Sequence, residues 1–301
     1  MFHLIINANK LNDTGKTGKA TQEKLSAIER VFEKAGRKVV LHTTEYAGHA
    51  TRIAKELTSG EEVVNLVAIG GDGTLHEVLN GVTDVEKCTL GLIPLGSGND
   101  FAETARIPVD AEEAAKVIAF RSPTKIDYIE LGSGVRSINA VGMGIDVDVL
   151  KRTYSGKKTG KDKYLSAFVK SLMHYKAGRY KVVYDGKEEE HAGIICCLGN
   201  GRQIGGGIML FPEADIRDGY IDLVFVDCIS KFSTLFAFAK LKAGKINKVK
   251  QVTHVKCKQV NVTPLGDTST TIQAEGELYE NTALNAHIVE GKLAFYLPDN
   301  D

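Results

Sequence analysis

The first 127 residues alternate short apolar runs with stretches of helical periodicity, and this rhythm constrains the fold more than any other feature. HLIIN at residues 3–7 reads as a strand, and a helical stretch follows it and ends at Gly36. The alternation continues through RKVVLHTT, AGHATRIAKEL, NLVAIGG, TLHEVLNGV, TLGLIPLG and AEEAAKVIAF. It predicts an α/β domain with a mostly parallel sheet covered by helices, whose ligands bind beyond the carboxyl ends of the strands.

The sequence after about residue 128 is rich in strand patterns, among them SINAVGMGID, YIDLVFVD and HVKCKQVNVTP. The pair Asp185-Gly186 between two apolar runs is a hairpin signal. Two stretches with helical character, at 163–175 and 232–241, interrupt the strands. This half therefore predicts an antiparallel β domain.

We divide the chain at these changes of pattern into residues 1–127, residues 128–283 and a C-terminal segment, 284–301, which we expect to return to the first domain. Nothing in the composition suggests a low-complexity linker between the two domains. We expect the domains to meet along a cleft, which is a common place for a ligand.

Charge and cysteine usage exclude several classes of protein. The 38 basic and 38 acidic residues balance to a net charge of zero, so binding of nucleic acid through a broad basic field is not expected. Five cysteines without C-x-x-C spacing suggest neither a disulfide framework nor a zinc site. No run of about 18 apolar residues is present. We expect a cytoplasmic protein.

The stretch AIGGDGTLHEVLNG, residues 68–81, carries the first sign of chemistry. Gly70, Gly71 and Gly73 let the backbone approach a ligand, and helix amides behind Thr74 offer donors to an anion. Asp72 suits such a place if the anion arrives with Mg²⁺, as in a metal nucleotide. The alternative is a tight turn in which Asp72 only caps the helix.

A second loop, PLGSGNDFA at residues 94–102, has the same composition. It follows an apolar strand and combines two glycines with Ser97 and Asp100 ahead of a helix. Two such loops at neighbouring strand ends would form one site.

The pair GGDGTLHEVLNG and PLGSGNDFA closely resembles the signature of the diacylglycerol kinase catalytic domain family, in particular the soluble bacterial lipid kinases. The likeness extends over nearly the whole chain, through IINANKLNDTGK, the Thr-Thr of LHTTEYAGHA, LGNGRQIGGG, FPEADIRDGYIDL and AEGE. The resemblance implies a first domain like that of NAD kinases and phosphofructokinases, which binds nucleotide, and an antiparallel β-sandwich domain that binds the lipid substrate.

The resemblance also implies ATP and Mg²⁺ as cofactors and assigns residues to them. Asp72 and Asp100 would hold catalytic Mg²⁺, directly or through water. The family usually has Thr at the position of Ser97 and often has Pro at that of Ala8. The nucleotide contacts would come from Asn7, Asn9, Thr43 or Thr44, Gly70, Gly71, Asp72, Gly73, Thr74, Glu77, Ser97 and Asn99.

The catalytic base of the family lies in a D-G-E motif, and this chain has Glu275-Gly276-Glu277 instead. Two carboxylates are kept, but the longer Glu275 changes the reach of the first by more than about an ångström. Asp127, Lys16 and Lys163 resemble the charge network that supports the base in the family. Read without the resemblance, Glu275 and Glu277 are two solvated acids in a hairpin turn.

FPEADIRDGYIDL contains Asp215, Asp218 and the carbonyl of Tyr220, all hard oxygen ligands suited to Mg²⁺. In the lipid kinases the like-placed segment binds a structural Mg²⁺. The residues alone describe an ordinary acidic turn.

The stretch from Lys231 to Lys250 mixes phenylalanines and leucines with lysines and is basic and amphipathic. It suits an anionic membrane surface, where a lipid kinase meets its substrate, and equally suits a helix packed on its own domain. We therefore expect transfer of the ATP γ-phosphoryl group to a lipid hydroxyl, with peripheral binding at the inner face of the membrane. Diacylglycerol, a phosphatidylglycerol-like lipid and a sphingoid base remain open as acceptors, and so does a homodimer. The alternatives are a catalytically weakened nucleotide-binding regulator and an NAD kinase.

Overall fold

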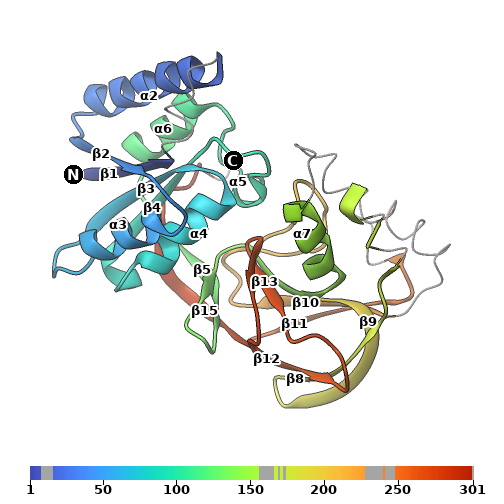
Figure 1. Cartoon of the computed structure of the whole chain (residues 1–301). Helices are drawn as coiled ribbons and strands as arrows, with labels where there is room; N and C mark the ends of the chain where they lie inside the picture. Colours follow the sequence, from blue (N-terminus) through green and yellow to red (C-terminus); the bar gives the residue numbers. More distant parts are fainter. Residues whose placement is uncertain are drawn as a thin grey trace. The chain divides into compact units, whose positions relative to one another are not determined.

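The computed structural model describes residues 1–7, 16–155, 166–168, 170–171, 174–227, 240 and 248–299. The chain divides into an α/β unit, Met1–Ile126 with Gly291–Asp301, and a β unit, Asp127–Glu290 (Figure 1). The division expected from the sequence falls after residues 127 and 283. In the structure the second boundary lies inside strand β15, Leu284–Phe295, because this strand pairs with strands of both units.

The sheet of the α/β unit is parallel. Its strands are β1 Phe2–Asn7, β2 Val39–Thr44, β3 Val64–Gly70 and β4 Cys88–Pro94, in the order β2-β1-β3-β4, and the end of β15 lies beside β4. Every residue of β4 is buried, as expected for a strand that helices cover on both faces. The predicted parallel α/β domain is confirmed.

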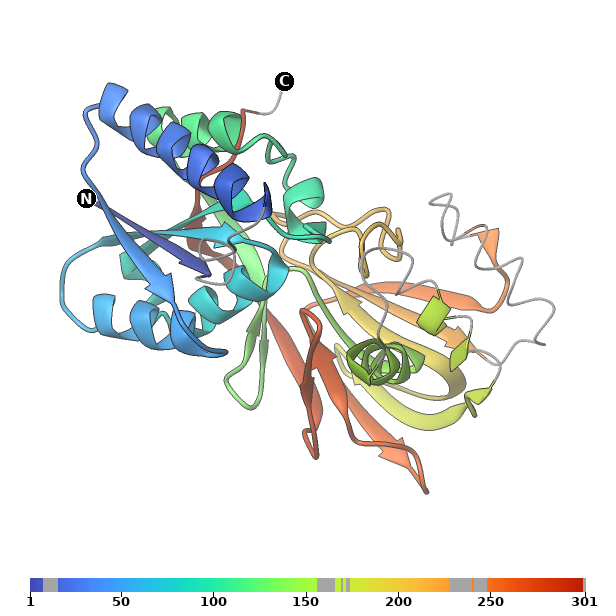
Figure 2. The same ribbon diagram turned by 45° about the horizontal axis from the view of Figure 1, so that its top comes forward.

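Helices cover both faces of this sheet. Figure 1 and Figure 2 show α2 (Lys16–Lys34) and α6 (Ala111–Phe120) on one face and α3 (His49–Leu57) and α4 (Asp72–Gly81) on the other. A short helix α5, Asp100–Thr104, and a 3₁₀ turn, Val85–Lys87, complete the unit. The side chain of Asp110 caps α6, because its Oδ1 accepts the N–H groups of Glu112 and Glu113 at 3.0 Å each.

The β unit is antiparallel, as the sequence predicts. Strand β9 pairs with β7, β8 and β10, β10 pairs with β11, and β12 lies between β8 and β15. Its strands, besides β15, are β5 Thr124–Leu131, β6 Arg136–Ser137, β7 Ala140–Gly144, β8 Gly178–Tyr184, β9 Lys187–Gly199, β10 Ile221–Asp227, β11 Val252–Cys257, β12 Gln259–Leu265, β13 Ile272–Ala274 and β14 Glu277–Tyr279.

The predicted hairpin at Asp185-Gly186 is confirmed. These two residues join β8 to β9 and have φ angles of 44° and 82°, which are the positive values that a tight two-residue hairpin turn requires. The prediction of one strand through Asp146 is wrong. The strand ends at Gly144, whose φ is 118°, and helix α7 runs from Ile145 to Ser155.

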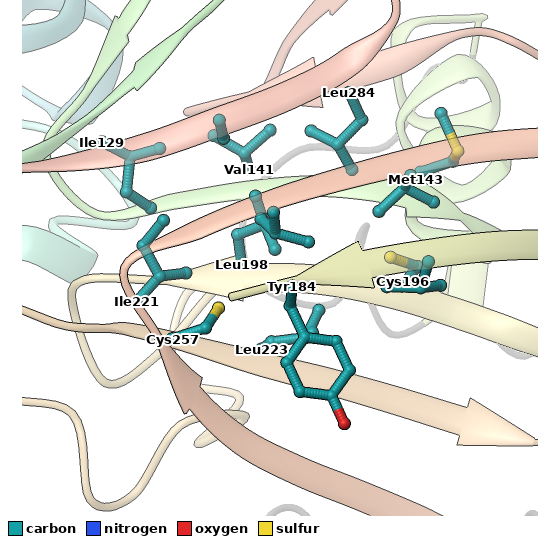
Figure 3. Packing of buried hydrophobic residues seen from close by; sticks show 14 of the residues in the cluster. Ile129, Val141, Met143, Tyr184, Cys196, Leu198, Ile221, Leu223, Cys257 and Leu284 are labelled. Carbon is teal, nitrogen blue, oxygen red and sulfur yellow. The ribbon is translucent and has the colours of Figure 1, made fainter. Parts of the chain in front are cut away.

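The core of the β unit includes a large apolar cluster that lines the sheet (Figure 3), and a second cluster includes Ile145 and Val149 of α7. Leu198, Ile221 and Leu284 are fully buried in the large cluster, although they come from strands that are far apart in the sequence. Burial of each such side chain contributes roughly 1.5–3 kcal/mol to the stability of the folded chain. Because the cluster joins side chains from several strands, strand pairing and core formation stabilise each other.

Two predicted helical stretches are described only in part. Residues 166–168, 170, 171 and 174 are helical, whereas the stretch at 232–241 lies outside the described residues except for Lys240. In the part of the chain that the structure describes, no helix is long and apolar enough to cross a membrane.

Candidate active site

The two glycine loops lie side by side because β3 and β4 are parallel neighbours that end at the same edge. Gly70 is paired in register with Pro94, and the N–H of Leu95 donates to the carbonyl of Gly70 at 2.7 Å. A Cβ on Gly71 would lie only 3.0 Å from the Cα of Gly96. Glycine at these positions lets one loop touch the other through the backbone.

Asp72 joins these loops. Its Oδ2 accepts the N–H of Asp100 and its Oδ1 accepts that of Phe101, both at 3.1 Å. Asp100 and Phe101 begin α5, so Asp72 caps the neighbouring helix instead of its own. The negative charge in the glycine loop therefore has a structural partner on the second loop.

The second loop is closed by Asn99. This residue has a φ of 58°, and its side-chain amide exchanges two hydrogen bonds of 3.0 Å with the backbone of Gly96. A Cβ on Gly98 would lie 3.1 Å from Oδ2 of Asp72 and 3.9 Å from Oδ2 of Asp100. Both carboxylates thus face the same glycine, and two carboxylates at one place favour a bound cation.

A pocket of about 240 Å³ opens beside the first loop. The residues that line it are Asn7, Thr44, Glu45, Tyr46, Ala47, Ala50, Thr74 and Glu77. Four of the residues assigned to the nucleotide from the sequence, Asn7, Thr44, Thr74 and Glu77, are brought together here. Of the two threonines that the sequence left open, Thr44 is buried and lines the pocket, whereas Thr43 is exposed.

Glu77 also has a structural partner. Its Oε2 accepts the N–H of Ala50 at 3.1 Å, and its carbonyl accepts the hydroxyl of Thr51 at 2.9 Å. The carboxylate therefore caps α3 and fixes the helix that forms one wall of the pocket.

Sequence reasoning missed Tyr46 at the pocket. The residue is 54% exposed, and its ring stacks on that of His49 at a centroid distance of 4.5 Å and an interplanar angle of 2°. Arg52 bonds to His49 Nε2 at 2.9 Å and lies over the Tyr46 ring at 5.9 Å. An aromatic residue two positions after Thr44 was the signal in the sequence that could have found it.

In the β unit, Glu275 is not the solvated acid of the simplest sequence interpretation. Its Oε1 accepts the hydroxyl of Ser137 at 2.5 Å and the N–H groups of Asn139 and Ala140 at 2.6 and 3.2 Å. Glu275 has a φ of 53° and forms the β13–β14 turn, whereas Glu277 is exposed at the start of β14. The first carboxylate of the motif holds the start of β7.

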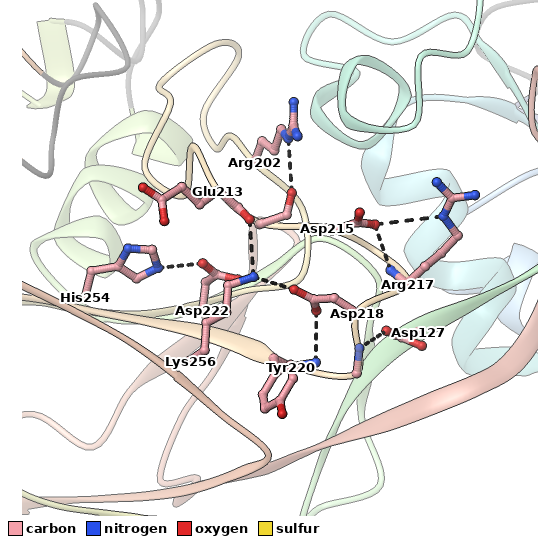
Figure 4. A network of polar contacts seen from close by, with 12 residues as sticks. Asp127, Arg202, Glu213, Asp215, Arg217, Asp218, Tyr220, Asp222, His254 and Lys256 are labelled. Atoms are coloured by element: carbon pink, nitrogen blue, oxygen red, sulfur yellow. Dashed lines mark hydrogen bonds and ion pairs between the residues drawn. The ribbon is translucent and has the colours of Figure 1, made fainter. Parts of the chain in front are cut away.

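Asp127 is 1% exposed and anchors the loop that contains Asp215 and Asp218. Its Oδ2 accepts the N–H of Gly219 at 2.8 Å, and its own N–H donates to the carbonyl of Ile216 at 2.8 Å (Figure 4). The side chain that the sequence assigned to a charge network thus packs against the acidic turn of the same unit.

The carboxylate of Asp218 lies against an ammonium group. Lys256 Nζ donates to Asp218 Oδ2 and to the carbonyl of Glu213, the latter at 3.3 Å, and lies 3.7 Å from Asp222 Oδ2 (Figure 4). Burial lowers the pKa of Lys256, but the carboxylates of Asp218 and Asp222 outweigh it and raise the pKa above its usual value.

The remaining predicted residues are Ser97, Asn9, Lys163 and Lys16. Ser97 lies in the second loop and is exposed. Asn9, Lys163 and the side chain of Lys16 lie outside the described residues. In the described part of the chain, no three His, Cys, Asp or Glu side chains form a group that could hold a metal ion.

Comparison with known protein families decides the relationship. The profile of the Diacylglycerol kinase catalytic domain matches residues 5–131, and that of the YegS C-terminal NAD kinase beta sandwich-like domain matches residues 139–296. The chain belongs to the diacylglycerol kinase family. The two profiles together cover both units.

Curated diacylglycerol kinases of Staphylococcus aureus, from strains bovine RF122 / ET3-1 and JH9, are 30% identical over 247 residues. This alignment spans 81% of the chain and 78% of each relative. A crystal structure of a diacylglycerol kinase from Bacillus anthracis str. Sterne has a TM-score of 0.78 and 24% identity, with 99% of this chain and 96% of that chain covered. That likeness supports the two-domain fold of the family.

Proposed function

We propose that the chain is an ATP-dependent lipid kinase that transfers the γ-phosphoryl group to the hydroxyl of diacylglycerol or a related lipid. The observation that carries the proposal is the pocket lined by Asn7, Thr44, Thr74 and Glu77, next to two glycine loops that Asp72 ties together. Glycine loops and a helix N-terminus are suited to phosphate groups, and the adjoining pocket has room for the nucleoside. Membership of the family makes ATP the natural nucleotide.

Asp72 and Asp100 are the residues that would hold a Mg²⁺ ion arriving with the nucleotide. Both carboxylates face Gly98, and such a pair in a partly buried site is stabilised by a cation. Asp72 uses one acceptor position on each oxygen for a backbone N–H, and a carboxylate oxygen has a second. Bound Mg²⁺ would neutralise charge on the phosphates during transfer.

The base that accepts the proton of the lipid hydroxyl is assigned to the Glu275-Gly276-Glu277 turn. Oε1 of Glu275 already accepts three hydrogen bonds, so a base role for Glu275 would fall to its Oε2. Glu277 is the second candidate because it is exposed. The long Glu275 and its structural bonds favour, as the alternative function, a nucleotide-binding regulator with weakened transfer.

The deciding experiment is phosphorylation of a total lipid extract with labelled ATP and Mg²⁺, followed by identification of the labelled product. Phosphatidic acid as product would establish diacylglycerol as the acceptor, and another phospholipid would name a different one. Binding of ATP without any labelled lipid would favour the regulator, and ADP release that requires NAD would favour an NAD kinase.

We also propose that the substrate is met at a membrane surface. The support is the basic amphipathic stretch from Lys231 to Lys250, most of which lies outside the described residues. Sedimentation with anionic vesicles but not with neutral ones is the expected result. Equal recovery with both, or with neither, would contradict it. Size-exclusion chromatography with light scattering would test the homodimer that the sequence leaves open.

A further inference from the structure

One lysine lies at the centre of the acidic loop of the β unit. Lys256 is on β11, directly opposite Asp222 on β10, and its ammonium reaches across to the loop that precedes β10. There it contacts the carboxylate of Asp218, the carbonyl of Glu213 at 3.3 Å and Oδ2 of Asp222 at 3.7 Å (Figure 4). Two carboxylates and a carbonyl thus converge on one cation.

These partners are the hard oxygen groups that Mg²⁺ prefers. Asp222 is 1% exposed, and its Oδ1 is bonded to His254 Nε2 at 2.5 Å. A buried carboxylate beside the carboxylate of Asp218 requires a positive partner, because burial of unpaired charge is strongly unfavourable. Lys256 supplies that charge from within the chain.

Three other oxygen atoms of the loop accept hydrogen bonds. The carbonyl of Ala214 accepts Arg202 Nε at 3.0 Å, and Oδ1 of Asp215 accepts the N–H of Arg217 at 3.1 Å. Oδ1 of Asp218 accepts the N–H of Tyr220 at 3.0 Å. Of the groups that resemble the family's structural Mg²⁺ ligands, the Asp218 carboxylate is therefore occupied on both oxygens, by the N–H of Tyr220 and by the ammonium of Lys256.

We infer that Lys256 is the built-in cation of this loop and takes the place of the structural Mg²⁺ ion that the resemblance implies at Asp215, Asp218 and Tyr220. The β unit then depends on Lys256, and not on a divalent ion, to hold residues 213–222 against β11. This goes beyond the proposed kinase activity and is independent of it.

Thermal unfolding of the full chain, monitored by circular dichroism, tests the inference. It is measured without nucleotide or lipid, once in excess EDTA and once in millimolar Mg²⁺. The wild-type melting temperature is expected to be the same in both. Lys256→Ala leaves two carboxylates without a cation and should lower the melting temperature in EDTA by about 5 °C. Mg²⁺ should restore part of that loss, because the smaller side chain leaves room for the ion.

Two variants serve as controls. Lys256→Met also removes the charge but fills the space, so it should be destabilised without recovery in Mg²⁺. Lys258→Ala removes a neighbouring lysine whose side chain is 55% exposed and pairs with Glu290 at 3.1 Å, so little change is expected.

The wild-type comparison decides the inference even if a variant fails to fold. If Mg²⁺ raises the melting temperature of the wild type and Asp218→Asn abolishes that rise, the inference is overturned, because the loop then holds the ion itself. A rise that Asp218→Asn leaves unchanged comes from elsewhere and agrees with the inference. The inference would also be overturned if Lys256→Ala were as stable as wild type in EDTA. The same holds if Mg²⁺ raised the melting temperatures of Lys256→Ala and Lys256→Met equally.

Discussion

Substitution of Glu275 by aspartate restores the usual family residue, yet the structure predicts that it destabilises this chain. Oε1 of Glu275 lies 2.6 Å from the N–H nitrogen of Asn139 and 3.2 Å from that of Ala140. Removal of one methylene withdraws the carboxylate by about 1.5 Å, the length of a C–C bond. The shorter of these contacts would open to about 4 Å, beyond hydrogen-bond range.

The cost follows from the groups left behind. Two backbone N–H groups and the hydroxyl of Ser137, which is fully buried, would lose an ionised acceptor. An unsatisfied buried donor costs about 1–3 kcal/mol, and the serine hydroxyl can rotate toward another acceptor. We therefore expect Glu275→Asp to lower the free energy of unfolding by about 2–4 kcal/mol. Turnover should fall with it, because the site has adapted to the longer side chain.

The assay is urea unfolding followed by circular dichroism, since the chain contains no tryptophan. Glu277→Asp is the matched control, because Glu277 is exposed and its substitution should change stability by no more than about 0.5 kcal/mol. A Glu275→Asp variant with the wild-type midpoint and a higher turnover would refute the reasoning. It would show that the carboxylate of residue 275 serves the reaction and that its bonds to Ser137 and Asn139 are dispensable.

Three further predictions concern the α/β unit. Asp72→Asn should lower the free energy of unfolding by about 1–3 kcal/mol and also lower turnover, because the NH₂ group of the new asparagine would face a backbone N–H of Asp100 or Phe101. Thermal unfolding and an activity assay measure the two effects, and unchanged stability would contradict the loop-joining role of Asp72. Tyr46→Ala should raise the KM for ATP about tenfold, because stacking of the base on an exposed ring would be lost, whereas Tyr46→Phe should not raise it. Equal KM values for wild type and both variants would exclude Tyr46 from the site. Burial lowers the pKa of His76 from 6.5 to about 4. Between these pH values the unfolded chain binds more protons than the folded chain, so acidification through this window should lower the free energy of unfolding by up to about 3 kcal/mol. Denaturation at several pH values should show a shallower loss below pH 6.5 in His76→Gln, and an identical loss would contradict this.

The sequence predicts well what depends on neighbours along the chain. The strands and helices of the first half, the glycine loops and the Asp185-Gly186 hairpin follow from short patterns, and the structure has them. The failure at α7 has a local cause as well. IDVDVL, residues 145–150, alternates apolar and acidic side chains, and over six residues this period cannot be distinguished from that of a strand.

The partners of the acidic residues could not be predicted, because they depend on strand pairing. Asp72 is bonded to residues 28 and 29 positions further on, and they meet only because β3 lies beside β4. Lys256 lies 38 positions after Asp218, in a stretch that reads as an ordinary half-exposed strand. Its position opposite Asp222 follows from the register of β10 and β11.

A structural partner does not exclude a catalytic role, but the kind of partner decides which roles remain. The carboxylate of Asp72 accepts two neutral N–H groups, so it keeps its charge and its remaining lone pairs for a cation. Those bonds also fix its position, which is what a ligand at a phosphate site requires. Oε1 of Glu275 likewise accepts neutral donors, an O–H and two N–H groups. Asp218 differs because its partner is itself a cation, and a second positive ion there would be repelled by Lys256. Asp72 therefore stays suited to a Mg²⁺ ion in the α/β unit, whereas for the acidic loop of the β unit this difference supports the inference that Lys256 takes the place of the ion.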